Sequence, residues 1–149
     1  MGYKLIALDI DGTLLNSSNQ ITENVKEAIR KSKEKGVKVV LCTGRPLKGV
    51  ENFLDELNLK EEGDYVSTFN GALVQDAHTG KPISHLTLDY EDLCDLYDLS
   101  VEVGSRSHFY DTRTVYTFNR EVSDYTILEA YLTGVHLNVT ELDEVPKDI

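Results

Sequence analysis

The fold is decided by one stretch near the N-terminus, which reads Leu5-Ile6-Ala7-Leu8-Asp9-Ile10-Asp11-Gly12-Thr13-Leu14-Leu15. Its first four residues form a short apolar run, which predicts a buried parallel strand. Asp9 and Asp11 lie two residues apart, so in an extended chain their carboxylates point the same way. If the strand ends near Asp9, Gly12 can turn the chain and leave both acids at the carboxyl edge of the sheet, where open α/β sheets place their chemistry.

The two acids have no basic residue close by in the sequence. We therefore interpret them as partners of a cation and a phosphate, in preference to a structural salt bridge. The alternative is a strand that ends in an acidic turn, because Asp and Gly are ordinary turn residues.

Two further apolar runs end in polar residues. Val39–Cys42 is followed by Thr43-Gly44-Arg45-Pro46, and Tyr65–Phe69 is followed by Asn70-Gly71-Ala72. Together the three segments resemble the haloacid dehalogenase-superfamily phosphatases: Asp-x-Asp-Gly-Thr resembles their motif I and Thr43 resembles motif II. Asn70-Gly71-Ala72 resembles a feature of the Cof-type branch, which carries a large α/β cap and includes bacterial sugar phosphatases. The resemblance extends from Lys4 to about Val139.

The resemblance implies a mechanism. Asp9 would attack phosphorus and form an aspartyl-phosphate, a known type of covalent intermediate. Asp11 would protonate the departing alkoxide and then activate water, and its presence at this position favours phosphoester hydrolysis over the chemistry of the ion pumps and the dehalogenases. The Asp9 carboxylate and the Asp11 main-chain carbonyl would hold Mg²⁺, which prefers hard oxygen ligands.

The same resemblance implies a set of residues that bind phosphate or substrate, namely Gly12, Thr43, Gly44, Arg45, Asn70 and Gly71. Thr43 would donate its hydroxyl to a phosphate oxygen, helped by backbone N–H groups around Gly44. Arg45 is a candidate for a charged substrate group, and its alternative is a salt bridge to one of the many acids. Asn70 and Gly71 would line the substrate entrance, and their alternative is simple punctuation between a strand and a turn.

Two family motifs are not visible: a Lys after the cap, and an acidic Gly-Asp-x-x-x-Asp segment. Lys81 and Lys147 are the later lysines, and neither precedes a second core-strand pattern. The sequence thus resembles a family member truncated within its cap. Three functions stay open: a Mg²⁺-dependent phosphatase acting on a small sugar phosphate or related metabolite, an inactive fragment of one, and a non-catalytic interaction module on the same scaffold.

The expected fold class is α/β: the N-terminal part of a haloacid dehalogenase-like parallel three-layer core over residues 1–88, then the first half of an α/β cap over 89–149. The patterns predict helices over 23–35, 46–57, 89–102 and 122–132, and strands over 5–8, 37–42, 65–69, 72–74, 82–88, 108–110, 115–118 and 135–139. Thr22 is the expected cap of the first helix. The expected core stripes are Val25, Ala28 and Ile29; Val50, Phe53, Leu54 and Leu57; Leu93, Tyr97 and Val101; and Val122, Tyr125, Leu128 and Leu132. Tyr110, Tyr116 and Tyr131 are expected mostly in the core of the cap.

Composition excludes several partners. The 149 residues carry a net charge of −11 and 40% hydrophobic residues, which fits a globular chain and argues against binding to nucleic acid or anionic membranes. The acids between Asp89 and Glu102 are expected on a solvated helix face. No signal peptide or membrane-spanning run is present, and Cys42 and Cys94 show no redox spacing, so we expect a cytoplasmic protein with free thiols. Without the missing strands, Leu5–Leu8 becomes an exposed edge, which predicts self-association.

Overall fold

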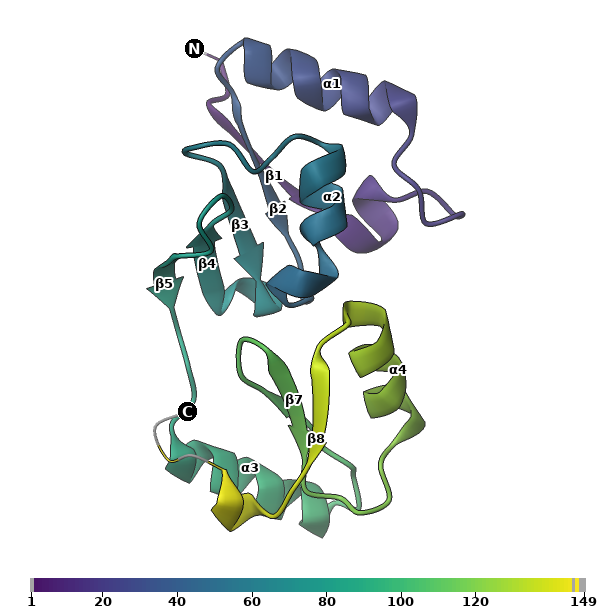
Figure 1. Cartoon of the computed structure of the whole chain (residues 1–149), viewed down its shortest axis with the longest axis vertical. Helices are drawn as coiled ribbons and strands as arrows, with labels where there is room; N and C mark the ends of the chain where they lie inside the picture. The colour runs from purple at the N-terminus through teal and green to yellow at the C-terminus, as the bar shows by residue number, and fades with distance from the viewer. Residues whose placement is uncertain (1, 146, 148–149) are drawn as a thin grey trace. The chain divides into compact units, whose positions relative to one another are not determined.

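The computed structural model describes residues 2–145 and 147. The chain divides into two compact units, Met1–Leu86 and Thr87–Ile149 (Figure 1). Within the described residues, no helix is both long and apolar enough to cross a bilayer.

The first unit is built on a five-stranded sheet in the order β1-β2-β3-β4-β5 (Figure 1). Its strands are β1 (Leu5–Asp9), β2 (Lys38–Cys42), β3 (Tyr65–Thr68), β4 (Leu73–Asp76) and β5 (Pro82–His85). The first three are parallel, and β4 and β5 add antiparallel as a hairpin. Two helices, α1 (Glu23–Glu34) and α2 (Glu51–Glu56), connect the parallel strands, and short helical turns lie at Ile10–Leu14, Leu47–Gly49 and Phe69–Gly71.

Both helices pack on one face of this sheet. Leu8, Leu41 and Val66 lie side by side in the strand register, and Ile29 of α1 and Leu54 of α2 belong to the same buried cluster. The predicted stripe Val50, Phe53, Leu54 and Leu57 also enters this core. In the described part of the chain, the expected three-layer core is thus represented by the sheet and one helical layer.

Strand β1 is present as predicted and extends to Asp9, but the expectation that it is buried is wrong. Leu5 is 55% exposed, and Ala7 is exposed as well. Both point to the sheet face opposite the helices, and among the described strands β1 pairs with β2 alone. A strand at an edge with one uncovered face keeps half of its side chains in contact with solvent.

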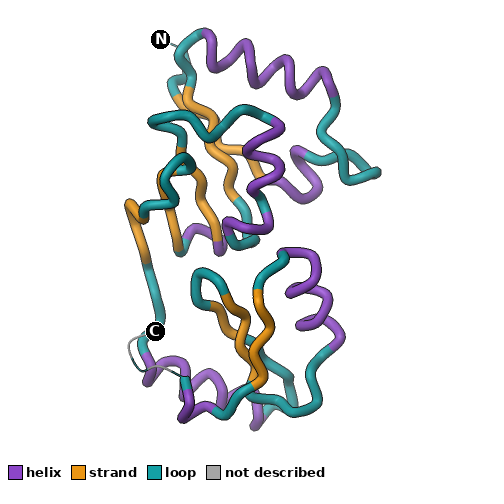
Figure 2. Tube along the Cα trace, viewed as in Figure 1, coloured by secondary structure: helices purple, strands orange, loops and turns teal. Residues whose placement is uncertain are grey.

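The second unit combines a three-stranded sheet with two helices (Figure 2). The strands β6 (Phe109–Tyr110) and β7 (Thr114–Thr117) are antiparallel, and β8 (His136–Val139) lies parallel to β7. The helices are α3 (Tyr90–Glu102) and α4 (Asp124–Thr133), and a 3-10 turn spans Leu142–Glu144. Asp89 caps α3 in a reciprocal box with Asp92. The acids of α3 and its cap are all exposed, as predicted.

Several predicted helix faces differ from the structure. On α4, the expected core positions Tyr125, Leu128 and Leu132 are 82%, 50% and 56% exposed, and Tyr131 is 82% exposed, whereas the buried residues are Thr126, Ala130 and Thr133. Val101 of α3 is 56% exposed, while Tyr110 and Tyr116 do pack against the buried clusters. On α1, Ala28 is exposed, and Thr22 stands at the N-cap without a side-chain capping hydrogen bond. The small residues of α4 thus form its buried face, and its large side chains lie outward.

Candidate active site

The carboxyl ends of the three parallel strands meet at one edge of the first sheet. Asp9 pairs in register with Cys42, and Cys42 pairs with Ser67. The chain leaves this edge in three loops, which follow β1, β2 and β3. All eight sequence-predicted site residues lie at this edge or on these loops, which therefore form the candidate active site.

Asp9 is the last residue of β1, and its carboxylate is exposed. Its Oδ2 accepts a long hydrogen bond of 3.4 Å from the hydroxyl of Thr13. The neighbouring Cys42 thiol has its pKa raised, first by burial and then by the charge of Asp9, although a hydrogen bond with Ser67 opposes the shift. An exposed carboxylate whose one hydrogen bond among the described residues is this long can still bind a cation or attack an electrophile.

Asp11 does not stand free, because Arg45 holds it. The Nε of Arg45 donates to Oδ2 at 3.0 Å and Nη2 donates to Oδ1 at 2.6 Å, so both carboxylate oxygens are engaged. The remaining Nη1 donates to the Gly49 carbonyl at 3.4 Å, and the guanidinium lies 5.7 Å from the ring centroid of Phe53. Of the two interpretations of Arg45, the structure shows the salt bridge, and it is made to a member of the predicted catalytic pair.

Thr43 lies at the start of the second loop and is 6% exposed. Its hydroxyl accepts from the backbone N–H of Arg45 at 3.1 Å, and its carbonyl accepts from the backbone N–H of Asn70 at 2.9 Å. The Arg45 carbonyl also accepts from Phe69 N–H at 3.3 Å. These backbone bonds fix the second loop to the third.

The third loop is strained. Phe69, Asn70 and Gly71 have successive positive φ values of 50°, 55° and 93°. A non-glycine residue in the left-handed region costs about 1–3 kcal/mol and persists where the surroundings hold it. Here the two hydrogen bonds to the Thr43–Arg45 segment do so. The Asn70 side chain also lies against Gly44, where an added Cβ would stand 3.0 Å from Asn70 Oδ1.

Gly12 serves the turn that the sequence predicts, with φ at +79° directly after Asp11. Sequence reasoning missed Thr13, which donates to Asp9, and Ser67, which lies beside Cys42. Thr13 could have been found from its place in the Asp-x-Asp-Gly-Thr segment. Ser67 could not, since only the strand register brings it level with Cys42.

The chain has many carboxylates, with 26 Asp and Glu residues, but their grouping decides whether they can bind a metal. Across the described residues, no group of three or more His, Cys, Asp or Glu side chains is arranged to hold a metal ion. At the candidate site, the available oxygen ligands are the Asp9 carboxylate and main-chain carbonyls.

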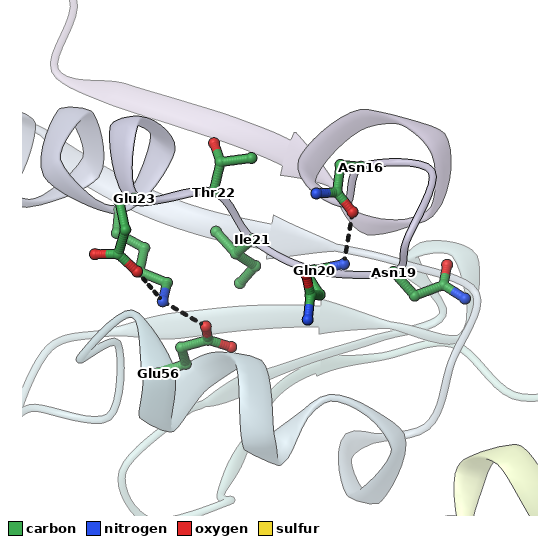
Figure 3. A pocket seen from close by; sticks show the side chains of 8 residues that line it. Asn16, Asn19, Gln20, Ile21, Thr22, Glu23 and Glu56 are labelled. Atoms are coloured by element: carbon green, nitrogen blue, oxygen red, sulfur yellow. Dashed lines mark hydrogen bonds and ion pairs between the residues drawn. The ribbon is translucent and has the colours of Figure 1, made fainter.

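A separate polar depression of about 520 Å³ lies between the loop before α1 and the end of α2 (Figure 3). Glu23 and Glu56 point toward one another across it, and Lys26 forms ion pairs with them at 2.6 and 2.8 Å. Asn16 and Gln20 are joined there by a hydrogen bond of 3.0 Å from the Gln20 N–H. None of the predicted site residues lines this depression.

Comparison with known proteins places the fold and motifs in a family. A family model described as haloacid dehalogenase-like hydrolase matches residues 6–148. The Bacillus subtilis protein named "Putative phosphatase YxeH" is 56% identical over 147 residues, covering 99% of this chain and 54% of that protein. "Phosphatase YwpJ" of the same species is 34% identical over 111 residues, covering 74% and 36%.

Solved structures give the same result. A haloacid dehalogenase-like hydrolase from Bacteroides thetaiotaomicron matches with a TM-score of 0.79 at 28% identity, covering 97% of this chain and 55% of that one. The subclass IIB sugar phosphatase BT4131 has the same fold, with a TM-score of 0.73 at 23% identity, covering 95% of this chain and 54% of that one. The chain spans about half the length of the curated relatives first matched. It belongs to the haloacid dehalogenase-like hydrolases.

Proposed function

We propose that this chain carries the nucleophile-bearing part of a Mg²⁺-dependent phosphatase that acts on a small sugar phosphate or a related metabolite. The observation that carries the proposal is the exposed Asp9 carboxylate at the carboxyl edge of three parallel strands, with Asp11, Thr43 and Arg45 on adjoining loops. Relatives named as phosphatases support the reaction class.

In the proposed reaction, Asp9 Oδ attacks phosphorus, the bond from phosphorus to the substrate oxygen breaks, and an aspartyl-phosphate forms. Asp11 gives a proton to the departing alkoxide. Water then attacks phosphorus and passes its proton to Asp11, which releases phosphate and regenerates the Asp9 carboxylate. Proton transfer of this kind contributes typically about 10²–10⁴-fold to a rate.

The residues fit Mg²⁺ by chemistry, since the Asp9 carboxylate is exposed and holds one long hydrogen bond only among those described. Mg²⁺ binds through one or two carboxylates together with substrate phosphate. Asp9 and the Asp11 carbonyl would hold it, and the ion would stabilise charge on the phosphoryl oxygens. Thr43, Gly12 and the Gly44 N–H would contact phosphate.

Substrate choice would rest on Arg45, Asn70 and Gly71 together with the second unit. We propose that residues 1–88 form part of a Cof-type core and 89–149 part of its cap. The likeness in fold to the sugar phosphatase BT4131 supports this division into core and cap. We propose that the protein works in the cytoplasm, because Cys42 and Cys94 are both free thiols.

The test is hydrolysis of a panel of sugar phosphates by this chain with and without Mg²⁺, alongside Asp9→Asn. The matched control is Asp95→Asn, which removes an exposed carboxylate from α3. We expect weak turnover at most from this chain alone. Any turnover should require Mg²⁺, be lost in Asp9→Asn and be kept in the control.

Turnover that survives Asp9→Asn would remove Asp9 as nucleophile. If phosphate and Mg²⁺ bind without turnover, the chain is an inactive form of the same site. If neither one binds, the scaffold serves as an interaction module.

A further inference from the structure

Among the described residues, Arg45 contacts all three loops of the candidate site. Its carbonyl accepts from Phe69 on the third loop, its own backbone lies in the second, and its side chain holds Asp11 on the first. We propose that Arg45 is a positioning residue that holds Asp11 in reserve, and that a phosphate group displaces Asp11 from the guanidinium and thereby frees it. This inference rests on the proposed function.

The observed pair restricts the acid role proposed for Asp11. Both oxygens accept from the same planar fork, at 3.0 and 2.6 Å. Two parallel hydrogen bonds fix the plane of a carboxylate as well as its position. Each oxygen keeps a second lone pair, but while the fork holds, the carboxylate cannot move or rotate to follow a leaving group. The pair would therefore open before proton transfer.

The Arg45 guanidinium has contacts that would hold it in place when Asp11 moves away. Nη1 donates to the Gly49 carbonyl and the Phe53 ring lies beside the group, so Arg45 is anchored on the side away from Asp11. The Arg45 side chain is 27% exposed, whereas the Asp11 side chain is 55% exposed. Asp11 also directly precedes Gly12, which has a left-handed backbone conformation. Asp11 is thus the less enclosed partner, and in the proposed exchange it moves while Arg45 stays.

A phosphate group can replace the carboxylate because it offers the same geometry. Arginine forks bind carboxylate and phosphate alike through two parallel hydrogen bonds, and a phosphate brings more negative charge. Ion pairs this exposed to solvent are weak, so a bound phosphate can compete with Asp11. Substrate entry would then free the acid only when it is needed.

The test is a double-mutant cycle that uses inorganic phosphate as the probe, at fixed Mg²⁺, with binding followed by the NMR shift of the Gly44 amide. If Asp11 competes for Arg45, Asp11→Asn should tighten phosphate binding about fivefold, the strength of an exposed ion pair. In an Arg45→Met background the same substitution should have no effect. Arg45→Lys keeps the charge without the fork, so it should retain only a small part of the coupling.

An equal gain in both backgrounds would mean that Asp11 merely repels phosphate, and the reserve role would be overturned. Phosphate binding without coupling in any background would overturn that role and leave the proposed function intact. No phosphate binding in any variant would overturn both. Circular dichroism of each variant checks the fold. Arg45→Met keeps an unbranched apolar chain beside Phe53, so it limits the loss of packing there.

Discussion

Lys33 of α1 forms the most buried ion pair among those described, and its removal should destabilise the first unit strongly. Its Nζ lies 3.2 Å from Oδ2 of Asp64, whose side chain is 5% exposed, and 3.0 Å from Glu61 Oε2. It also donates to the Asn58 carbonyl. In Lys33→Met, Asp64 still accepts from the Glu61 N–H at 3.0 Å, but this buried carboxylate loses its positive counter-ion.

Breaking a buried pair costs about 3–5 kcal/mol, and an orphaned buried group about 1–3 kcal/mol. The Lys33 side chain is 20% exposed, so water can reach the site and the lower range applies. We expect a loss of about 2 kcal/mol in the free energy of unfolding. For a unit of this size that corresponds to a fall of about 10 °C in Tm.

Thermal and urea unfolding followed by circular dichroism measure the change. The matched control is Lys31→Met on the same helix, which removes an exposed pair with Glu27 at 3.2 Å and should cost at most about 0.5 kcal/mol. A double variant, Lys33→Met with Asp64→Leu, should recover much of the loss because no unpaired charge remains. If Lys33→Met costs no more than the control, the reasoning fails.

The same pair gives a pH dependence. Burial lowers the pKa of Lys33, but the carboxylates of Glu61 and Asp64 raise it more, so the net shift is upward from 10.5. A raised pKa in the folded state means that the stabilisation is complete below the unfolded value and is lost as pH rises through the folded value. Stability should therefore fall at alkaline pH above about 10.5 in the wild type and less in Lys33→Met.

Three further outcomes are expected. Gly44→Ala should cost about 1 kcal/mol in thermal unfolding, since its Cβ would meet Asn70 Oδ1 at 3.0 Å; an unchanged Tm would mean that Asn70 moves aside freely. Asp9→Asn should speed the alkylation of Cys42 near pH 8 in a chain without the second cysteine, because the Asp9 charge helps to raise that thiol pKa; an equal rate would contradict this. Light scattering should show concentration-dependent association through β1 that Leu5→Lys weakens, and a strictly monomeric wild type would refute it.

The fold could be predicted wherever a short apolar run stood between turn residues. The strands that carry Leu8, Leu41 and Val66 are confirmed for this reason. The buried face of α4 could not be predicted, because a hydropathy pattern assigns threonine to the solvent-exposed face of a helix. Thr126 is buried with its hydroxyl 3.0 Å from His108 Nδ1, and Thr133 donates to the Glu129 carbonyl at 2.7 Å. A satisfied hydroxyl costs little to bury, and hydropathy alone cannot detect that it is satisfied.

The candidate site could likewise be predicted only where local sequence determines it. The positions of Asp9 and Asp11 follow from local alternation and a glycine turn, so the sequence places them. The Asp11–Arg45 pair spans 34 residues and depends on Asp9 lying level with Cys42, which brings the next loop residues into reach. Nothing local in the sequence encodes that register. An ion pair between residues of different loops is thus a feature that a single sequence does not predict.

This pair also changes how an acidic chain could attract a phosphate. Asp9 and Asp11 each bring a negative charge and Arg45 one positive charge, and the chain as a whole carries −11. With Arg45 held by Asp11, the edge offers an anion mainly backbone N–H groups and one exposed carboxylate that repels it. A divalent cation on Asp9 would reverse the local sign, and displacement of Asp11 would then uncover the guanidinium. Cation binding and release of Arg45 would act on the same charge balance, so phosphate affinity depends on both together.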